Sequence, residues 1–267
     1  MSSSVIIIPA RYESSRFPGK PLVSILGKTM LERVWRIAQK AIENDTQKKI
    51  YIATEDERIV KAAENFKAMA ILTSSQCQNG TERVYEVVKN LKLQPDIIIN
   101  LQGDAVLTPP HFITELISAM EKNPTWEMAT LGTAFNSEKW QAYVQRKKEG
   151  NNTGTLVLCD QKGKALYFSK GIIPHIRENK TGENFVPPVM KHIGIYAYRF
   201  SMLKKYLELS PTPLEQVEKL EQLRVLEHGY PIHVVKVDDG GRTLWSVDNP
   251  QDIQIVEDLL KKEGELC

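Results

Sequence analysis

The ten residues RYESSRFPGK, from Arg11 to Lys20, combine three cations, two serines and a glycine directly after the apolar run Val5–Ile8. Glycine lets a backbone approach an oxyanion closely, arginine binds phosphate through parallel N–H groups, and lysine adds a mobile point charge. The segment therefore predicts a loop that binds a phosphate-bearing ligand. It matches neither GxxxxGK[ST] nor GxGxxG, and a solvated surface loop would have a similar composition.

Two aspartates stand where a hard metal ion could be held. Asp104 follows the apolar stretch that ends in NLQGD, and Asp248 precedes a helical pattern in WSVDNPQD. Carboxylates are ligands that Mg²⁺ prefers. Each aspartate alone has a plainer interpretation, Asp104 as a turn former and Asp248 as a helix cap. Only the pair, taken together with the basic loop, predicts a magnesium site.

Three further motifs could contact a nucleotide or a sugar. NGTERV, Asn79–Val84, is either a capping motif with Thr81 as the N-cap or a polar clamp on a sugar or base. His192 in KHIGIYAYR is either a structural histidine on a strand or a ligand contact. LEQLRVLEHG is either an amphipathic surface helix or part of a site. The residue types alone leave both interpretations open.

Strand-like and helix-like segments alternate up to about residue 133. This alternation predicts an α/β domain with a mainly parallel sheet and right-handed crossovers. Ligands bind beyond the carboxyl ends of such strands, so RYESSRFPGK and QGD should lie at one edge. The predicted strands are Val5–Ile8, KKIYIAT ending at Thr54, AMAILT, Asp96–Leu101 and Met128–Thr133, and the predicted helices are Met30–Ala41, DERIVKAAENF, TERVYEVVKNL and Pro110–Lys122.

The second half of the chain is less regular. A polar loop is expected at QAYVQRKKEGNNTG, after a short helical stretch, and a flexible loop at NKTGENFVPP. TLVLCDQKGKALYFSK predicts a hairpin with its turn at Asp160–Lys164. The remaining predicted elements are a half-buried strand at HIGIYAYRF, a helix over LEQVEKLEQLRVLEHG that ends at Gly229, a strand at IHVVKV and a closing helix at Pro250–Lys262.

The composition narrows the class of protein. A chain of 267 residues with 42% hydrophobic and 25% charged residues is typical of soluble globular proteins. A net charge of +2 predicts no general nucleic-acid surface. Cys77, Cys159 and Cys267 have no metal-binding spacing. The first apolar run lacks a basic leader and is too short to cross a bilayer, so we expect a cytoplasmic protein with no membrane partner.

Taken in order, the motifs resemble those of the 3-deoxy-manno-octulosonate (Kdo) cytidylyltransferases. The resemblance runs from about Val5 to Leu260 and rests on IIIPARYESSRFPGKPL, NGTERV, LQGD, GKALYFSKGIIP, KHIGIYAYR, PLEQVEKLEQLRVLEHG and VDNPQDI. It implies a nucleotide-diphospho-sugar transferase fold. It also implies transfer of CMP from CTP to the anomeric hydroxyl of Kdo, with pyrophosphate as the second product, by a Mg²⁺-dependent homodimer in lipopolysaccharide or capsule synthesis.

The resemblance also implies one domain over 1–267 and assigns roles within it. The nucleotide-binding half is about 1–135, and the half at about 136–267 serves the sugar and dimerisation with a smaller β-rich segment. Arg83 is the expected partner of the sugar carboxylate. The implied catalytic residues are Arg11, Lys20 and Asp104; the metal ligands are Asp104 and Asp248; the nucleotide contacts are Pro9, Ala10, Arg11, Ser15, Arg16, Lys20, Thr81 and Gln102; and the sugar contacts are Arg83, Gln102, His192, Tyr196, Glu221 and Gln222.

The chain departs from the family pattern in four places. Ala105 replaces the glutamate of QGDEP, Cys77 stands where histidine is common, Thr155 lies where a lysine is typical, and Lys170 replaces an arginine. We expect these changes nearer the sugar side of the site or its scaffold, where they would affect the choice of sugar acid more than the chemistry. The alternatives are therefore the same reaction on an 8-amino-Kdo or a nonulosonate, and a nucleotide-binding regulatory protein without turnover.

Overall fold

The computed structural model describes residues 3–13, 17–45, 47–150, 153–176, 185 and 187–267. In these ranges the strands form a nine-stranded sheet and a small separate hairpin. The strands are β1 (Ser4–Pro9), β2 (Ser24–Ile25), β3 (Lys28–Thr29), β4 (Lys49–Thr54), β5 (Ala70–Leu72), β6 (Ile97–Leu101), β7 (Met128–Ala134), β8 (Leu156–Cys159), β9 (Ala165–Ser169), β10 (Met190–Tyr198) and β11 (His233–Val237).

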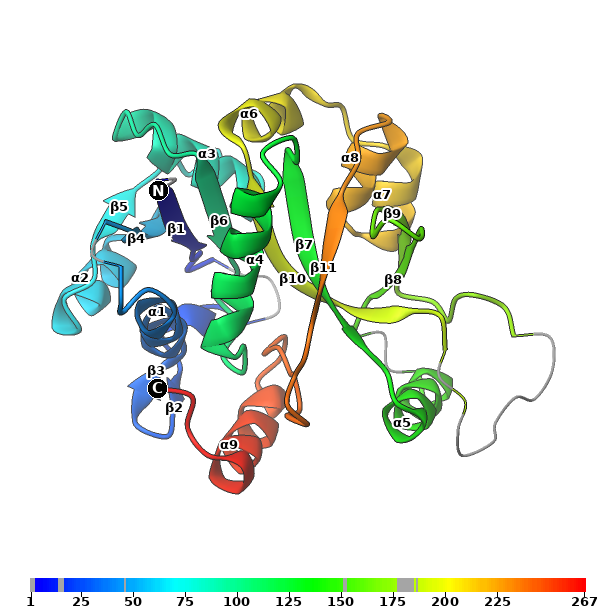
Figure 1. The fold of residues 1–267 in the computed structure, drawn as a ribbon. Helices are drawn as coiled ribbons and strands as arrows, with labels where there is room; N and C mark the ends of the chain where they lie inside the picture. Colours follow the sequence, from blue (N-terminus) through cyan, green and yellow to red (C-terminus); the bar gives the residue numbers. More distant parts are fainter. Residues whose placement is uncertain (1–2, 14–16, 46, 151–152, 177–184, 186) are drawn as a thin grey trace.

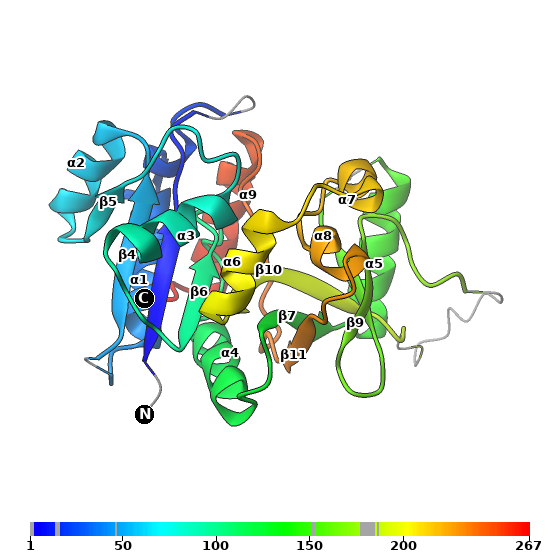
Figure 2. The same ribbon diagram turned by 90° about the horizontal axis from the view of Figure 1, so that it is seen from above.

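Helices cover both faces of the large sheet (Figures 1 and 2). None of those within the described ranges is long and apolar enough to cross a membrane. The helices are η1 (Lys20–Leu22), α1 (Met30–Ala41), α2 (Glu57–Asn65), α3 (Gly80–Asn90), α4 (Pro110–Lys122), α5 (Ser137–Lys148), α6 (Phe200–Glu208), α7 (Pro213–Glu218), α8 (Gln222–Glu227) and α9 (Gln251–Glu263).

The sheet is mainly parallel, and the predicted fold class is confirmed. Its central order is β11-β7-β10-β6-β1-β4-β5, with β8 and β9 attached through β10. β1 runs parallel to β4 and β6, β4 to β5, and β11 to β7. β10 is antiparallel to both of its central neighbours, because the chain re-enters the sheet from its second half. β10 thereby brings second-half residues beside the strands of the first half.

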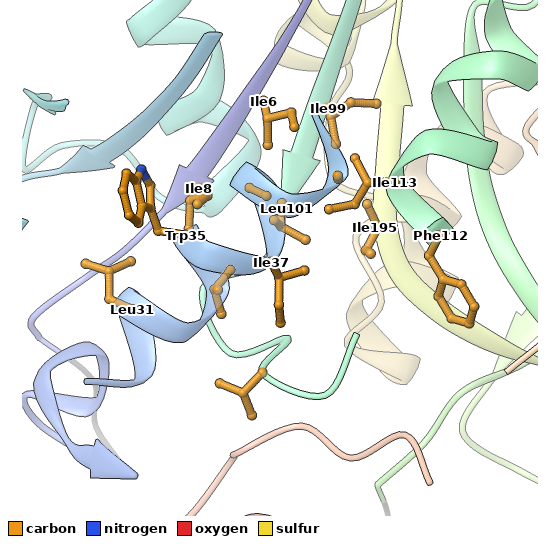
Figure 3. Close-up of a cluster of buried hydrophobic side chains, with 14 of the residues drawn as sticks. Ile6, Ile8, Leu31, Trp35, Ile37, Ile99, Leu101, Phe112, Ile113 and Ile195 are labelled. Atoms are coloured by element: carbon orange, nitrogen blue, oxygen red, sulfur yellow. The ribbon is translucent and has the colours of Figure 1, made fainter. Parts of the chain in front are cut away.

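The first apolar run is a strand buried on both faces. Val5–Ile8 is at most 3% exposed. Ile6 and Ile8 pack in the cluster that includes α1 and α4, whereas Val5 and Ile7 pack in the cluster that includes α3 and α6. Figure 3 shows Ile6 and Ile8 beside the side chains of α1. Burial on both faces explains why the run is continuously apolar rather than alternating.

Three predicted elements agree closely with the structure. α1 and α4 have the predicted bounds, and Thr29 caps α1 by accepting a hydrogen bond from Glu32 N. β8 and β9 form the predicted hairpin, whose turn is closed by Asp160 N donating to Lys164 O at 2.8 Å. These segments carry strong local signals, which are helical spacing with a cap and strand runs joined by a short turn.

The predicted cap of the third helix is wrong by two residues. Asn79, not Thr81, is the N-cap of α3, and its side chain accepts from Glu82 N at 2.9 Å. Asparagine and threonine are both effective N-caps, so local preference did not decide between them. The hydroxyl of Thr81 instead lies in a buried hydrogen-bond network described below.

The predicted polar loop after residue 140 is wrong up to Lys148, because α5 continues through it. Trp140 and Tyr143 are buried against Phe135 in a separate apolar cluster. Cations in the last turn, including Arg146 and Lys147, favour a helix C-terminus. The predicted flexible loop NKTGENFVPP falls mostly outside the described residues.

The single helix predicted over LEQVEKLEQLRVLEHG is also wrong, because the chain forms α7 and α8. Lys219 between them adopts a left-handed backbone conformation with φ of 53°. The Glu215 carboxylate accepts two hydrogen bonds from the Arg224 guanidinium, at 2.7 and 2.8 Å. This paired contact holds the two short helices together and leaves Glu221 at the break, where it lines the site.

Candidate active site

The ends of β1 and β6 meet at one edge of the sheet, as parallel neighbours must. The loop after β6 approaches so closely that a Cβ on Gly103 would lie 2.8 Å from the carbonyl oxygen of Pro9. A Cβ on Gly80, at the start of α3, would lie 3.2 Å from the Pro9 ring. Because glycine has no Cβ, the segments that contain Pro9, Gly80 and Gly103 can lie together at this edge.

A cavity of about 940 Å³ opens beside this edge, within the usual size of small-molecule sites. Residues from before and after residue 135 line it. Eight of the predicted site residues are among them, and these are Thr81, Gln102, Asp104, His192, Tyr196, Glu221, Gln222 and Asp248.

The basic loop reaches the cavity rim through Lys20. Its ammonium lies 2.8 Å from the Asp104 carboxylate. Gly19, with φ of 71°, closes the loop by donating its N–H to the Tyr12 carbonyl at 2.9 Å. Arg11 donates to the Cys77 carbonyl at 3.1 Å. Pro9, Ala10 and Arg11 adjoin the cavity without lining it, and Ser15 and Arg16 lie outside the described residues.

Asp104 and Asp248 line the same cavity from the two halves of the chain. The loop that carries Asp248 is held by Asp252, whose carboxylate accepts from Asp248 N at 2.8 Å, Asn249 N at 2.7 Å and Trp245 Nε1 at 2.9 Å. No cluster of three or more His, Cys, Asp or Glu ligands occurs among the residues that the structure covers. One or two carboxylates completed by phosphate oxygens and water is the usual Mg²⁺ arrangement, so the two aspartates fit this ion beside a triphosphate.

A chain of hydrogen bonds joins three motifs that are distant in sequence. Gln102 Nε2 donates to Asn100 Oδ1 at 3.1 Å, and Asn100 Nδ2 donates to Thr81 Oγ1 at 3.4 Å. Thr81 Oγ1 and the Tyr206 hydroxyl donate to Glu221 Oε2, at 3.5 and 3.3 Å. Burial raises the pKa of Glu221. This network gives the cavity wall a fixed set of polar groups, as recognition of a polyhydroxylated ligand requires.

His192 presents a neutral ring. Burial lowers its pKa to about 3. Thr130 Oγ1 donates its single proton to a β10 carbonyl, Ile195 O lying 2.8 Å away, so it accepts from His192 Nε2 at 3.0 Å. Nδ1 of this tautomer is then a hydrogen-bond acceptor. The register of β10 against β7 shifts between Ile193 and Tyr196, and such bulges re-aim side chains next to sites.

Comparison with known proteins agrees with this architecture. The family described as Cytidylyltransferase matches residues 5–236. The 3-deoxy-manno-octulosonate cytidylyltransferase of Maricaulis maris is 44% identical over 264 residues, covering 99% of each chain. The mitochondrial enzyme of that name from Arabidopsis thaliana is 41% identical, covering 98% of this chain and 85% of its own. The chain belongs to the 3-deoxy-manno-octulosonate cytidylyltransferase family.

A solved structure supports the same assignment. CMP:2-keto-3-deoxy-manno-octonic acid synthetase, complexed with CTP, is 35% identical, with a TM-score of 0.82. The match covers 98% of this chain and 100% of that protein. The family that the motifs predicted is therefore confirmed over nearly the whole chain, together with its nucleotidyltransferase fold.

Within this cytidylyltransferase, Arg83 does not occupy the position expected of a sugar contact. It is 1% exposed and does not line the cavity. Its guanidinium lies 2.9 Å from the Glu55 carboxylate and donates to Thr73 Oγ1 at 2.5 Å. Residues two apart on a helix point about 200° apart, so Thr81 and Arg83 cannot both face the cavity. The contact between Arg83 and the sugar carboxylate stays a prediction, one that the position of Arg83 outside the cavity lining does not favour.

The departures from the family pattern divide between two sides of the site. Ala105, Thr155 and Lys170 line the cavity, as a role in sugar selection requires. Cys77 does not line the cavity, and its carbonyl accepts a hydrogen bond from Arg11 of the basic loop. The Cys77 thiol donates to Glu86 at 2.9 Å, and burial raises the pKa of the thiol to about 12.

Sequence reasoning missed several cavity residues. Tyr143, Arg146 and Lys147 lie in the segment predicted to be a polar loop, although their helical spacing is present in the sequence. Lys191 and Trp245 also line the cavity. Lys191 directly precedes the His192 motif, so its position was visible, but strand alternation predicts that it points to the opposite face.

Proposed function

We propose that the protein transfers CMP from CTP to the anomeric hydroxyl of Kdo and releases pyrophosphate. One observation carries this proposal: in a chain of this family, the cavity lined by Asp104, the ion-pair partner of Lys20, is also lined by His192, Tyr196 and Glu221. A cationic, carboxylate-bearing end suits a triphosphate, and a buried polar end suits a sugar with several hydroxyls.

The reaction needs positioning and charge neutralisation rather than a protein nucleophile. The anomeric oxygen forms a bond to the α-phosphorus, the bond from that phosphorus to the α,β-bridging oxygen breaks, and pyrophosphate leaves with the electron pair. The hydroxyl proton passes to solvent. Lys20 and Arg11 are proposed to stabilise the charge that grows on the phosphate oxygens, an effect worth about 3–4 kcal/mol of barrier for one well-placed donor.

Asp104 and Asp248 are the proposed ligands of Mg²⁺. When bound, the ion would neutralise phosphate charge and help to hold the two anionic substrates in line. Lys20 forms an ion pair with Asp104 at 2.8 Å, so a cation suited to phosphate oxygens lies directly beside a proposed metal ligand. Asp252 fixes the backbone on either side of Asp248 and thereby limits the conformations that its loop can adopt.

The sugar pocket is proposed to include His192, Tyr196, Glu221 and Gln222. The side-chain amide nitrogen of Gln222 is buried with no hydrogen-bond partner among the described residues. An unmade hydrogen bond of a buried amide costs about 1–3 kcal/mol, which a sugar hydroxyl would recover. Glu221 could equally accept from a substrate amine, so an 8-amino-Kdo is a second candidate substrate.

The direct test is pyrophosphate release from CTP with a panel of keto-deoxy sugar acids. Turnover with Kdo exceeding that with 8-amino-Kdo and a nonulosonate supports the proposal. CTP binding without pyrophosphate release on any sugar acid would instead identify a regulatory protein. Asp104→Asn and Asp248→Asn should each lose most metal-dependent turnover, since an amide is a poorer Mg²⁺ ligand than a carboxylate.

A further inference from the structure

A site for a sugar acid needs a cation for the carboxylate, and Arg83 does not reach the cavity. Five other cations line it: Arg146, Lys147, Lys170, Lys191 and Lys219. Lys219 lies at the break between α7 and α8, and each of the other four is held by a carbonyl or a ring rather than by a carboxylate in the described structure. Lys147 donates to Gly154 O at 3.1 Å, Lys170 to Lys219 O at 3.4 Å and Lys191 to Leu244 O at 2.8 Å, while Arg146 lies 5.5 Å over the Trp245 ring.

Substrate chemistry discriminates among these cations. In a 2-keto-3-deoxy sugar acid the carboxylate is attached to the carbon that bears the attacking hydroxyl. The carboxylate must therefore lie beside the reacting phosphorus and the metal-binding aspartates. Lys170 is bound to the junction of α7 and α8, and Lys147 to the segment after α5. Lys191 and Arg146 both adjoin the loop that leads to Asp248, Lys191 through a hydrogen bond to Leu244 O and Arg146 over the Trp245 ring. Of these two, Lys191 has the hydrogen bond to the loop backbone.

The surroundings of Lys191 favour an anion. An ammonium has three N–H donors, and Leu244 O is the acceptor that the described residues supply. Burial and the neighbouring Arg146 lower the pKa of Lys191 to about 8, with Asp239 opposing them. A partly desolvated cation without a paired carboxylate gains when an anion binds to it. Its neighbour His192 lines the same cavity.

We propose that Lys191 binds the carboxylate of the sugar acid. This inference rests on the proposed function and transfers to Lys191 the role that the sequence had assigned to Arg83. Lys191 would then select sugar acids over neutral sugars, and this role is separate from that of the residues that bind the triphosphate.

The test compares Kdo with its neutral C1 carboxamide in the wild-type enzyme and in Lys191→Met. Wild type should favour Kdo by about 100-fold or more in kcat/KM, because a site built for a charged group rejects an analogue that lacks it. In Lys191→Met this preference should fall at least tenfold. The KM for CTP and the Mg²⁺ concentration for half-maximal rate should stay within about twofold, which separates loss of the carboxylate contact from disturbance of the Asp248 loop.

Lys147→Met is the matched control, since it removes a cavity-lining cation that bonds Gly154 O rather than Leu244 O and should keep the wild-type preference. If Lys191→Met does not fold, Lys191→Gln serves in its place. An unchanged preference for Kdo in the folded Lys191 variant overturns the inference. Loss of that preference in Lys170→Met would instead identify Lys170 as the residue that binds the carboxylate. Absence of turnover by wild type with Kdo would overturn the proposed function itself, so the two failures are distinguishable.

Discussion

At the scale of single residues, Arg83 acts on the nucleotide loop through a neighbour. Glu55 accepts from Tyr12 N at 3.0 Å and pairs with Arg83 at 2.9 Å. Arg83→Ala should therefore raise the KM for CTP more than the KM for Kdo, reversing the expectation from sequence. It should also cost about 3–5 kcal/mol in free energy of unfolding, because Glu55 loses its buried partner.

Steady-state kinetics at saturating co-substrate and urea unfolding would measure both effects. Arg83→Lys keeps a charge near Glu55 but loses the planar fork, so it should fall between wild type and Arg83→Ala. A selective increase in the KM for Kdo, with the KM for CTP unchanged, would contradict this role and restore the sugar contact.

His192 links protonation to stability. Its folded pKa of about 3 lies below the ordinary value of 6.5, so below pH 6.5 the unfolded chain binds a proton that the folded chain does not. Stability therefore falls as the pH drops from about 6.5 toward 3. Between pH 7 and pH 5 this histidine should account for about 2 kcal/mol of lost unfolding free energy.

The check is urea unfolding at both pH values for wild type and His192→Gln. Between pH 7 and pH 5, the free energy of unfolding should fall by about 2 kcal/mol less in the variant than in wild type. The exposed His175, changed to Gln, is the matched control and should follow wild type. Equal pH dependence in His192→Gln and wild type would mean that the ring titrates normally.

The residues that sequence reasoning placed well share one property. Gln102, Asp104 and Lys20 lie just after parallel strands or in the loop beyond one, and the topology alone brings such ends together. Thr81 lines the cavity and Arg83 does not, because the two residues face different sides of α3. Helical periodicity at Thr81 and Arg83 was sufficient to predict the difference.

At the scale of elements, the start of α9 and the loop before it form one unit. Asp252 accepts three hydrogen bonds from this loop, including two from the backbone at Asp248 and Asn249. Asp252→Asn replaces one acceptor oxygen by a donor and should release part of the loop. We expect the Mg²⁺ concentration for half-maximal rate to rise about tenfold, equivalent to about 1.4 kcal/mol, with kcat at saturating Mg²⁺ much less affected.

Asp258→Asn is the matched control, because it changes an exposed carboxylate on the same helix. Trp245 gives a second readout, since its indole N–H bonds Asp252 and its emission should change in Asp252→Asn without any substrate. Unaltered Mg²⁺ dependence and emission in Asp252→Asn would show that Asp248 is positioned without this carboxylate.

Elements were predicted well where local and tertiary signals agree. α1 and α4 have helical spacing and a core-facing stripe, α1 begins at the capping residue Thr29 and α4 at Pro110, and their bounds match the structure. α5 was missed because most of its surface is polar and only Trp140 and Tyr143 anchor it. The division of α7 from α8 depends on the pairing of Glu215 with Arg224 and on one left-handed residue, and neither is encoded in helix propensity.

At the scale of the whole molecule, β10 joins the two halves of the chain in one site. It crosses between β6 and β7 and carries Lys191, His192 and Tyr196 to the cavity. The alternation of strands and helices predicted the parallel part of the sheet. It could not predict this antiparallel insertion, because the choice of neighbouring strands depends on long-range packing rather than on the pattern within the strand.

Exposed apolar side chains on the second half indicate where a second copy of the chain would bind. Val217 on α7 is 82% exposed and Leu166 on β9 is 63% exposed. α7 and β9 are joined by Ser169 Oγ donating to Glu218 at 2.6 Å. Exposed apolar groups on adjoining elements favour a protein contact, and the family resemblance implies a homodimer. We therefore predict that this surface forms the dimer interface.

Val217→Glu should convert the dimer into a monomer, because a dimer would bury the new carboxylate without a partner. Light scattering coupled to size-exclusion chromatography measures the mass directly. Met69→Glu is the matched control, because Met69 is 59% exposed but lies beside β5, at the opposite edge of the sheet from the hairpin. A wild-type monomer, or a Val217→Glu protein that remains dimeric, would exclude this interface. Retention of CMP transfer by the monomer would further mean that each cavity is complete within one chain.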